Sequence, residues 1–271
     1  MNTSWLSVTR GDAPLIVSLP HTGTDLADLE PRLVSPWLGR RDCDWWIDRL
    51  YDFAADLGAT VIQTAISRTV MDVNRDPSGA SLYPGQATTG LCPIETFDGD
   101  PLYLPGAAPD AAETGRRRDL YFRPYHAAIE DEIARLRDQH AQIVLYDCHS
   151  IRSVIPPLFE GTLPVFNLGT NGGAAADPEL QARVTDLIAG SGRSWVVNGR
   201  FKGGWITRAH GRPENGVHAL QMELSCRGYL REPAGPVSPE NWPAAYEPGF
   251  AAPIRAQLIE TLETAIRWAR G

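Results

Sequence analysis

Short apolar runs that alternate with helical patterns constrain the fold of this chain most. Leu15–Leu19 has the pattern of a buried strand and is stopped by Pro20. Residues 44–57 then carry apolar side chains at helical spacing, and Gly58 stands where a left-handed cap is expected. Because parallel strands need crossover helices between them, this alternation predicts an α/β fold. We expect a three-layer α/β/α sandwich with a mostly parallel mixed sheet.

The rest of the chain repeats this alternation. Further strands are expected at residues 60–66, 143–146, 165–168, 195–197 and 219–224, and further helices at 119–139, 178–189 and 252–269. Residues 68–118 are rich in glycine and proline and lack periodicity. A connection of that length predicts a functional segment that covers a substrate. No interdomain linker is evident, so a single domain over residues 1–271 is expected.

Composition and charge exclude several classes of function. The chain has 271 residues and a formal net charge of −8, so its overall field repels nucleic acids and anionic membranes. The arginine run at 116–118 is interpreted as a solvated first turn of the helix that follows. No segment resembles a membrane span or a secretory signal, and the four scattered cysteines suit a reducing compartment. We therefore expect a cytoplasmic protein without nucleic-acid or membrane partners.

Polar side chains follow the expected strands at their carboxyl ends, where open α/β sheets form active sites. His21 follows the first strand and is either a metal ligand or a hydrogen-bonded structural residue. Asp147 and His149 follow strand 143–146 and share one face, whereas Cys148 faces the other way. This arrangement argues against a cysteine–histidine nucleophile. Asp147 either orients His149 for a metal or caps the following turn.

A carboxylate interrupts the strand pattern at residues 219–224. Glu223 shares a face with Gln221 and Ser225 in this run. A buried carboxylate must be paired, hydrogen-bonded or bound to a metal. The alternative is an edge strand on which Glu223 points to water.

A second carboxylate precedes the first expected helix. Asp44 is either the N-cap of that helix or a metal ligand. Two histidines and one carboxylate, with a fourth position left for water, form a catalytic zinc site. His21, Asp44 and His149 meet that count, and Asp42 and Asp25 compete for the carboxylate position.

Two loops supply polar groups for an anionic ligand. Asn74 and Arg75 offer an amide and a planar guanidinium that can hold a carboxylate, although such a pair is also common in surface turns. The glycine-rich segment 202–212 carries Lys202 and Arg208. This segment is either an anion clamp or a surface hairpin.

Six motifs of this chain, taken together, resemble those of the N-formylglutamate amidohydrolase family. In chain order they are Ser-Leu-Pro-His-Thr-Gly, Arg-Asp-Cys-Asp-Trp-Trp, Asp-Val-Asn-Arg-Asp, Tyr-Asp-Cys-His-Ser, Gly-Gly-Trp-Ile-Thr-Arg and Gly-Val-His-Ala-Leu-Gln-Met-Glu. The family is related to zinc carboxypeptidases and aspartoacylase-like deacylases. The resemblance implies a zinc-carboxypeptidase-like fold and one divalent metal, expected to be zinc. It also implies hydrolysis of N-formyl-L-glutamate to formate and L-glutamate, the last step of a histidine degradation pathway.

The resemblance also implies roles for individual residues. His21 and His149 match the two histidine ligands, and Glu223 matches the glutamate that activates water. Asn74 and Arg75 resemble the pair with which carboxypeptidases hold a substrate carboxylate.

The chain departs from the carboxypeptidase pattern in the carboxylate ligand. Carboxypeptidases place a glutamate three residues after the first histidine, where this chain has Thr24. Asp44 is chosen because its segment is strongly family-like. Arg68 or Arg208 is expected to stabilise the developing oxyanion, and the remaining cations, Lys202 among them, are expected to hold the second carboxylate of a small dianionic substrate.

Two other functions stay open on the sequence. One is a metal-dependent deacylase or deformylase of another N-acyl amino acid, and the other is a non-catalytic carboxylate-binding protein, against which Glu223 argues. His126 and His140 are placed in the long helix and given no role, and His218 is expected to face away from Glu223. The sequence predicts no oligomeric state.

Overall fold

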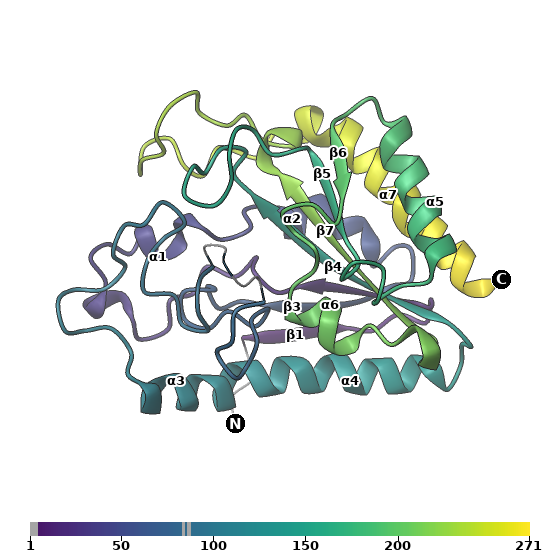
Figure 1. The fold of residues 1–271 in the computed structure, drawn as a ribbon, viewed down its shortest axis with the longest axis horizontal. Coiled ribbons are helices and arrows are strands. Elements are labelled where there is room, and N and C mark those ends of the chain that lie inside the picture. The colour runs from purple at the N-terminus through teal and green to yellow at the C-terminus, as the bar shows by residue number, and fades with distance from the viewer. Residues whose placement is uncertain (1–4, 83–84, 86–87) are drawn as a thin grey trace.

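The computed structural model describes residues 5–82, 85 and 88–271, which form a seven-stranded sheet between two layers of helices (Figure 1). The strand order is β1-β3-β2-β4-β7-β5-β6. Four of the neighbouring pairs are parallel, and the pairs β1–β3 and β5–β7 are antiparallel. The strands are β1 Leu6–Thr9, β2 Leu15–Leu19, β3 Thr60–Thr64, β4 Ile143–Ile151, β5 Phe166–Gly169, β6 Trp195–Val197 and β7 Val217–Ser225. The mostly parallel mixed sheet is therefore confirmed.

Helices cover both faces of the sheet. The helices are α1 Leu38–Arg41, α2 Ile47–Leu50, α3 Ala111–Arg117, α4 Arg123–Arg137, α5 Pro178–Gly190, α6 Trp205–His210 and α7 Pro248–Arg270. Short 3-10 turns lie at Glu30–Arg32, Asp52–Ala54, Pro213–Asn215 and Cys226–Gly228, and a π-helical turn lies at Arg118–Phe122. The apolar residues of α2, α5 and α7 pack on one face, and those of α4 and α6 pack on the other. This confirms the three-layer α/β/α sandwich.

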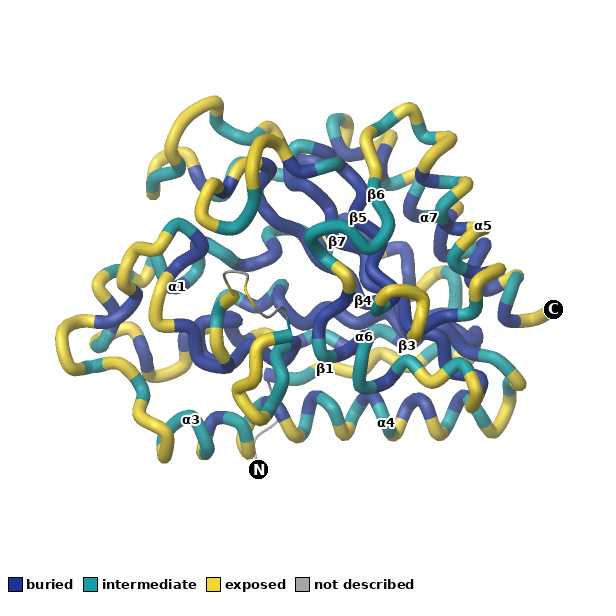
Figure 2. Tube along the Cα trace, in the orientation of Figure 1, coloured by how far each residue is buried: buried dark blue, intermediate teal, exposed yellow. Residues whose placement is uncertain are grey.

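The two longest strands lie in the middle of the sheet. Every residue of β4 and β7 is buried, and both strands run through the buried centre of the molecule in Figure 2. Val144, Tyr146 and Cys148 face α7, whereas Ile143 and Leu145 face α4. By the same alternation, Asp147 and His149 of β4 and Gln221 and Glu223 of β7 lie on the α4 side.

The prediction of one continuous helix over residues 44–57 is wrong. The structure replaces it with the short α2 and the 3-10 turn Asp52–Ala54. Trp46 adopts φ 63°, which is incompatible with a continuing right-handed helix, and its indole donates to the carbonyl of Ala244. Tertiary contacts thus override the helical spacing. Gly58 does adopt the left-handed conformation that its position predicts, with φ 75°.

The long helix begins earlier than expected. Asp110 caps α3 by accepting a hydrogen bond from the Glu113 amide at 2.7 Å, and the helical path continues through the π-helical turn into α4. The arginine run therefore lies inside this helical path, and its interpretation as a solvated first turn is wrong. Arg117 is buried and forms an ion pair with Glu113.

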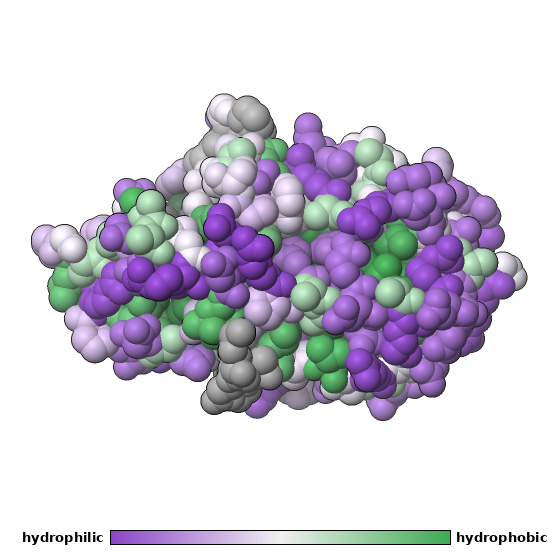
Figure 3. Space-filling view, turned by 90° about the horizontal axis from the view of Figure 1, so that it is seen from below, coloured by the Kyte–Doolittle hydropathy of each residue, from purple (hydrophilic) through white to green (hydrophobic). Residues whose placement is uncertain are grey.

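The sequence patterns predicted neither the short helix α1 nor two further elements. β1 is a short edge strand, and α6 lies inside the glycine-rich segment 202–212, where a hairpin was one alternative. The face that is seen from below in Figure 3 is mostly hydrophilic, with small separate apolar patches. Among the described residues, no helix has the length and apolarity needed to cross a membrane.

Candidate active site

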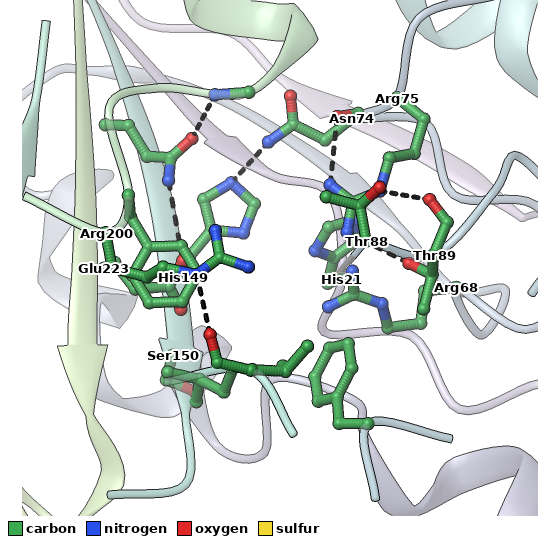
Figure 4. A pocket seen from close by; sticks show the side chains of 16 residues that line it. His21, Arg68, Asn74, Arg75, Thr88, Thr89, His149, Ser150, Arg200 and Glu223 are labelled. Carbon is green, nitrogen blue, oxygen red and sulfur yellow. Dashed lines mark hydrogen bonds between the residues drawn. The ribbon is translucent and has the colours of Figure 1, made fainter. Parts of the chain in front are cut away.

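A pocket lies at the carboxyl ends of β2, β4 and β7, on the α4 side of the sheet. It is bounded by the following residues: His21, Arg68, Asn74, Arg75, Thr88, Thr89, Phe97, His149, Ser150, Ile151, Leu158, Arg200, Phe201, Gly204, Gln221 and Glu223. Figure 4 shows Arg68 and Arg75 on one side of this pocket and Arg200 with Glu223 on the other. The site thus combines side chains from three neighbouring strands with side chains from the long irregular segment.

Three buried side chains converge at the base of the pocket. Nδ1 of His149 lies 3.1 Å from Oδ2 of Asp44, and Nδ1 of His21 lies 3.8 Å from the same oxygen. One atom from each of the three residues lies within 4.8 Å of the other two. This is the spacing that one bound metal ion requires of its ligands.

Two polar atoms of this cluster are buried without a hydrogen bond. They are Nδ1 of His21 and Oδ1 of Asp44, neither of which has a hydrogen-bond partner among the described residues. Such atoms carry an energetic penalty unless something else binds them. Two imidazole nitrogens and a carboxylate are the ligand set of a catalytic zinc site, so these residues fit a divalent metal.

Each histidine is held by a second carboxylate through its other ring nitrogen. Nε2 of His21 lies 2.8 Å from Asp72, and Nε2 of His149 lies 2.9 Å from Asp147. Because a carboxylate can only accept, each Nε2 carries a proton, and Nδ1 is the nitrogen that would ligate a metal. Burial would lower the pKa of His149, but Asp147 and Asp44 hold that pKa well above its usual range, so Nδ1 of His149 donates to Asp44. Asp147 lies within β4 and does not cap a turn, because the strand continues to Ile151.

The charge on Asp72 is maintained by its neighbours. Burial alone would raise the pKa of Asp72, but Arg75, His21 and Arg68 hold that pKa well below its usual range. Arg68 donates to Oδ2 at 2.6 Å, and the backbone amide of Asn74 donates to Oδ1 at 3.0 Å. Asp72 is therefore an anion that links the irregular segment to His21. No pattern in the sequence indicates a role for this residue.

The competing carboxylates lie outside the cluster. Asp42 accepts hydrogen bonds from the Phe97 amide and from Arg152. Asp25 accepts from the Ala27 amide in an exposed turn. Asp44 is not the N-cap of α2, because its side chain instead accepts from the backbone amide of Ser150 at 3.2 Å.

Glu223 lies in β7, between β4 and β5, so the edge-strand alternative is wrong. It is in register with His149 on β4, and Nε2 of Gln221 donates to it at 3.5 Å. Burial raises the pKa of Glu223 to about 8. The carboxyl group can therefore take up and release a proton near neutral pH.

Asn74 and Arg75 line the pocket but are also tied to the protein. The Asn74 amide donates to Asp147 at 3.1 Å, and its oxygen accepts from the Ile206 amide at 2.8 Å. Arg75 donates to the carbonyl and hydroxyl oxygens of Thr89. These bonds fix both side chains in orientations that face the pocket.

The cations of the glycine-rich segment are placed differently from expectation. Lys202 is exposed. Arg208 lies in α6, and its Nε donates to the carbonyl of Gly203. Neither residue is among the described residues that line the pocket, whereas Arg200 is. Arg200 was not predicted from the sequence, although it lies only two residues before the segment 202–212 that was considered as an anion clamp.

The remaining histidines are not part of the cluster. His218 contacts Gln142 and the Asp177 amide, away from Glu223. His140 lies beyond the end of α4, where it contacts the carbonyl of Asp12. His126 does lie in α4.

The model of the N-formylglutamate amidohydrolase family matches residues 13–230. The chain belongs to this family. The N-formylglutamate deformylase of Pseudomonas aeruginosa is 46% identical over 267 residues, which cover 98% of this chain and 97% of that protein. The N-formylglutamate deformylase of Pseudomonas putida is 43% identical over 265 residues, which cover 97% and 96%.

A solved structure of the N-formylglutamate amidohydrolase family has the same fold. The crystal structure of N-formylglutamate amidohydrolase from Ralstonia eutropha JMP134 matches with a TM-score of 0.77 at 24% identity, and the match covers 98% of each chain. The region matched by the family model contains every residue that lines the pocket. The family resemblance of the six motifs is thereby confirmed.

Proposed function

We propose that this chain hydrolyses N-formyl-L-glutamate to formate and L-glutamate at a single metal site, with zinc as the metal. One observation carries the proposal: buried atoms of His21 and Asp44 that have no hydrogen-bond partner among the described residues converge with His149 beside the buried Glu223. The names of the two Pseudomonas relatives supply the substrate. The proposal takes residues 1–271 as one catalytic domain, and the four free cysteines support a cytoplasmic location.

His21, Asp44 and His149 would hold the metal. When bound, a divalent metal supplies a Lewis acid that acidifies water and polarises a carbonyl group. Glu223 accepts a proton from the attacking water as the water oxygen bonds to the formyl carbon. As the carbon–nitrogen bond breaks, Glu223 returns that proton to the leaving nitrogen. Arg68 borders the pocket beside His21 and is proposed to stabilise negative charge on the formyl oxygen.

Three residues are proposed to hold the two carboxylates of the substrate. Arg75 and Asn74 bind one carboxylate, since both line the pocket. Arg200 binds the other from the opposite side of the pocket. Lys202 and Arg208 receive no substrate contact, because they lie outside the pocket lining.

The test compares two substrates of nearly equal shape. Zinc-loaded protein is given N-formyl-L-glutamate or N-formyl-L-glutamine, and formate release is measured with and without a chelator. We expect metal-dependent turnover with kcat/KM at least about 100-fold higher for the glutamate substrate, because loss of the side-chain charge leaves a buried cation unpaired. Equal kcat/KM values would instead identify a broader deformylase, and binding without turnover would identify a carboxylate-binding protein.

A matched pair of variants tests the role of Arg200. Arg200→Gln is expected to lower kcat/KM for N-formyl-L-glutamate about 100-fold and to leave that for N-formyl-L-glutamine nearly unchanged. Arg183→Gln removes an exposed arginine from α5, on the other face of the sheet, and should change neither value. Equal losses for both substrates would contradict a specific contact with the side-chain carboxylate.

A further inference from the structure

Two histidines outside the pocket form a hydrogen-bonded pair behind the site. Nδ1 of His126, on α4, lies 2.8 Å from Nε2 of His210, at the end of α6. Nε2 of His126 lies 2.8 Å from the carbonyl oxygen of Val73, and Nδ1 of His210 lies 2.9 Å from a carboxylate oxygen of Glu130. All four ring nitrogens of the pair are therefore hydrogen-bonded.

The partners at the two ends decide how many protons the pair holds. The Val73 carbonyl can only accept, so Nε2 of His126 must carry a proton. The pKa of Glu130 is lowered, chiefly by its hydrogen bond from His210, so this carboxylate also accepts and Nδ1 of His210 must carry a proton. The contact between the rings needs a third proton. Because two neutral imidazoles hold only two, the pair carries one positive charge.

The position of the charge follows from the surroundings. Burial, followed by the neighbouring His210, lowers the pKa of His126 to about 3. His126 contacts a neutral carbonyl, whereas His210 contacts the Glu130 carboxylate, so the charge resides on His210. Among the described residues, Arg212 also contacts Glu130, with Nη2 at 3.1 Å from the same carboxylate oxygen.

The pair contacts residues 72–74, which hydrogen-bond to side chains of the candidate metal site. Val73 lies between Asp72, which contacts His21, and Asn74, which contacts Asp147. The first turn of α6 contacts this segment as well, because the Ile206 amide donates to the Asn74 side chain. Residues 72–74 are thus joined to both ends of α6. The first turn of α6 contacts Asn74, and His210 at its last residue contacts Val73 through His126.

We propose that His126 and His210 share three protons as an imidazole–imidazolium pair and act as positioning residues that fix residues 72–74 beneath the metal histidines. The positioning role rests on the proposed metal site, whereas the proton count does not. Removal of the third proton at high pH leaves two ring lone pairs facing each other, leaves the buried Val73 carbonyl without a donor, or leaves a lone pair of His210 facing Glu130. Each arrangement breaks one contact of the chain that joins Glu130 to Val73. The attachment of residues 72–74 to α4 and α6 is therefore weaker once the pair has lost its third proton.

Nitrogen-15 NMR of the histidine rings in the metal-free protein tests the proton count. Near neutral pH we expect His210 to show two protonated nitrogens and His126 to show a protonated Nε2 with an unprotonated Nδ1. A neutral His210 with one unprotonated nitrogen would overturn the proposal. This measurement needs neither metal nor substrate, so its outcome is independent of the proposed hydrolysis.

Two neighbouring carboxylates of α4 provide a matched pair of variants. Glu130→Gln keeps an oxygen that can accept from His210 but removes the anion, so the pair should lose its third proton at a lower pH than in the wild type. Asp131→Asn removes an exposed charge that has no contact with the pair among the described residues, and it should titrate like the wild type. Equal titration of His210 in both variants would overturn the proposal.

The positioning role is tested at a pH where His210 is charged in the wild type and neutral in Glu130→Gln. There we expect Glu130→Gln to bind zinc about tenfold more weakly, as the loss of outer partners of metal ligands generally does. Asp131→Asn should bind zinc like the wild type. Unchanged zinc affinity in Glu130→Gln, despite a shifted His210 titration, would contradict the positioning role. Weak zinc binding by the wild type itself would instead count against the proposed function.

Discussion

Asp72 shows how much a single residue outside the candidate ligand set contributes. It is fully buried and contacts His21, Arg68 and the Asn74 amide. Asp72→Asn keeps the size but removes the anion, so we expect zinc affinity to fall about 10- to 100-fold in competition with a chelating dye. Asp76→Asn, in an exposed turn of the same segment, is the control and should bind zinc normally. Unchanged affinity in Asp72→Asn would contradict the orienting role.

At the same scale, the sequence could predict residues at strand ends but not their partners. His21 and His149 were found because strands end in polar residues at one edge of a parallel sheet. The partner of His21 is 51 residues away, in a segment without periodicity, so no local pattern points to it. Arg200 was missed for a related reason, since its loop has no regular spacing that would direct a side chain toward the pocket.

At the scale of elements, the backbone at the start of α6 lies against a side chain of the site. A Cβ atom on Gly204, at its N-cap, would lie 2.5 Å from the amide atoms of Asn74. Gly204→Ala must therefore displace Asn74, and we expect kcat/KM for N-formyl-L-glutamate to fall at least about tenfold. Gly90→Ala is the control, because a Cβ there meets nothing within 4 Å. Wild-type kinetics in Gly204→Ala would show that the position of Asn74 is not critical.

Elements were predictable where periodicity was strong. β2 and β6 have the expected bounds, and α5 ends one residue beyond its expected limit. The helix expected at 44–57 failed because the tertiary contacts of Trp46 outweigh spacing, and α6 was missed because six residues among glycines carry too little signal.

For the whole molecule, the alternation of strands and helices was sufficient to predict the three-layer α/β/α sandwich. The pH dependence of its stability, by contrast, follows from contacts that only the structure shows. Hydrogen bonds from Arg32 and Arg117 lower the pKa of Glu113 to about 2, although burial opposes this. A lowered carboxyl pKa stabilises the folded state above the ordinary pKa of about 4.5, and this contribution is lost as pH falls toward 2. Glu113 thus ties α3 to the turn Glu30–Arg32.

Chemical unfolding of Glu113→Gln tests this contribution. The variant should have a free energy of unfolding about 1 to 2 kcal/mol below that of the wild type at neutral pH, and the difference should shrink as pH falls below about 4.5. Glu263→Gln, which breaks an exposed ion pair on α7, should differ little from the wild type at any pH. A difference that persists at low pH would mean that packing, and not charge, accounts for the effect of Glu113.

The most direct test of the account is formate release from N-formyl-L-glutamate by zinc-loaded wild type and Glu223→Gln, with bound zinc measured in both. We expect both proteins to hold one zinc and only the wild type to turn over efficiently. The variant should lose about 100- to 10,000-fold in kcat, because an amide cannot accept and return the proton. A variant that binds zinc and keeps turnover within a few-fold of the wild type would contradict the central claim that Glu223 carries the proton from water to the leaving nitrogen.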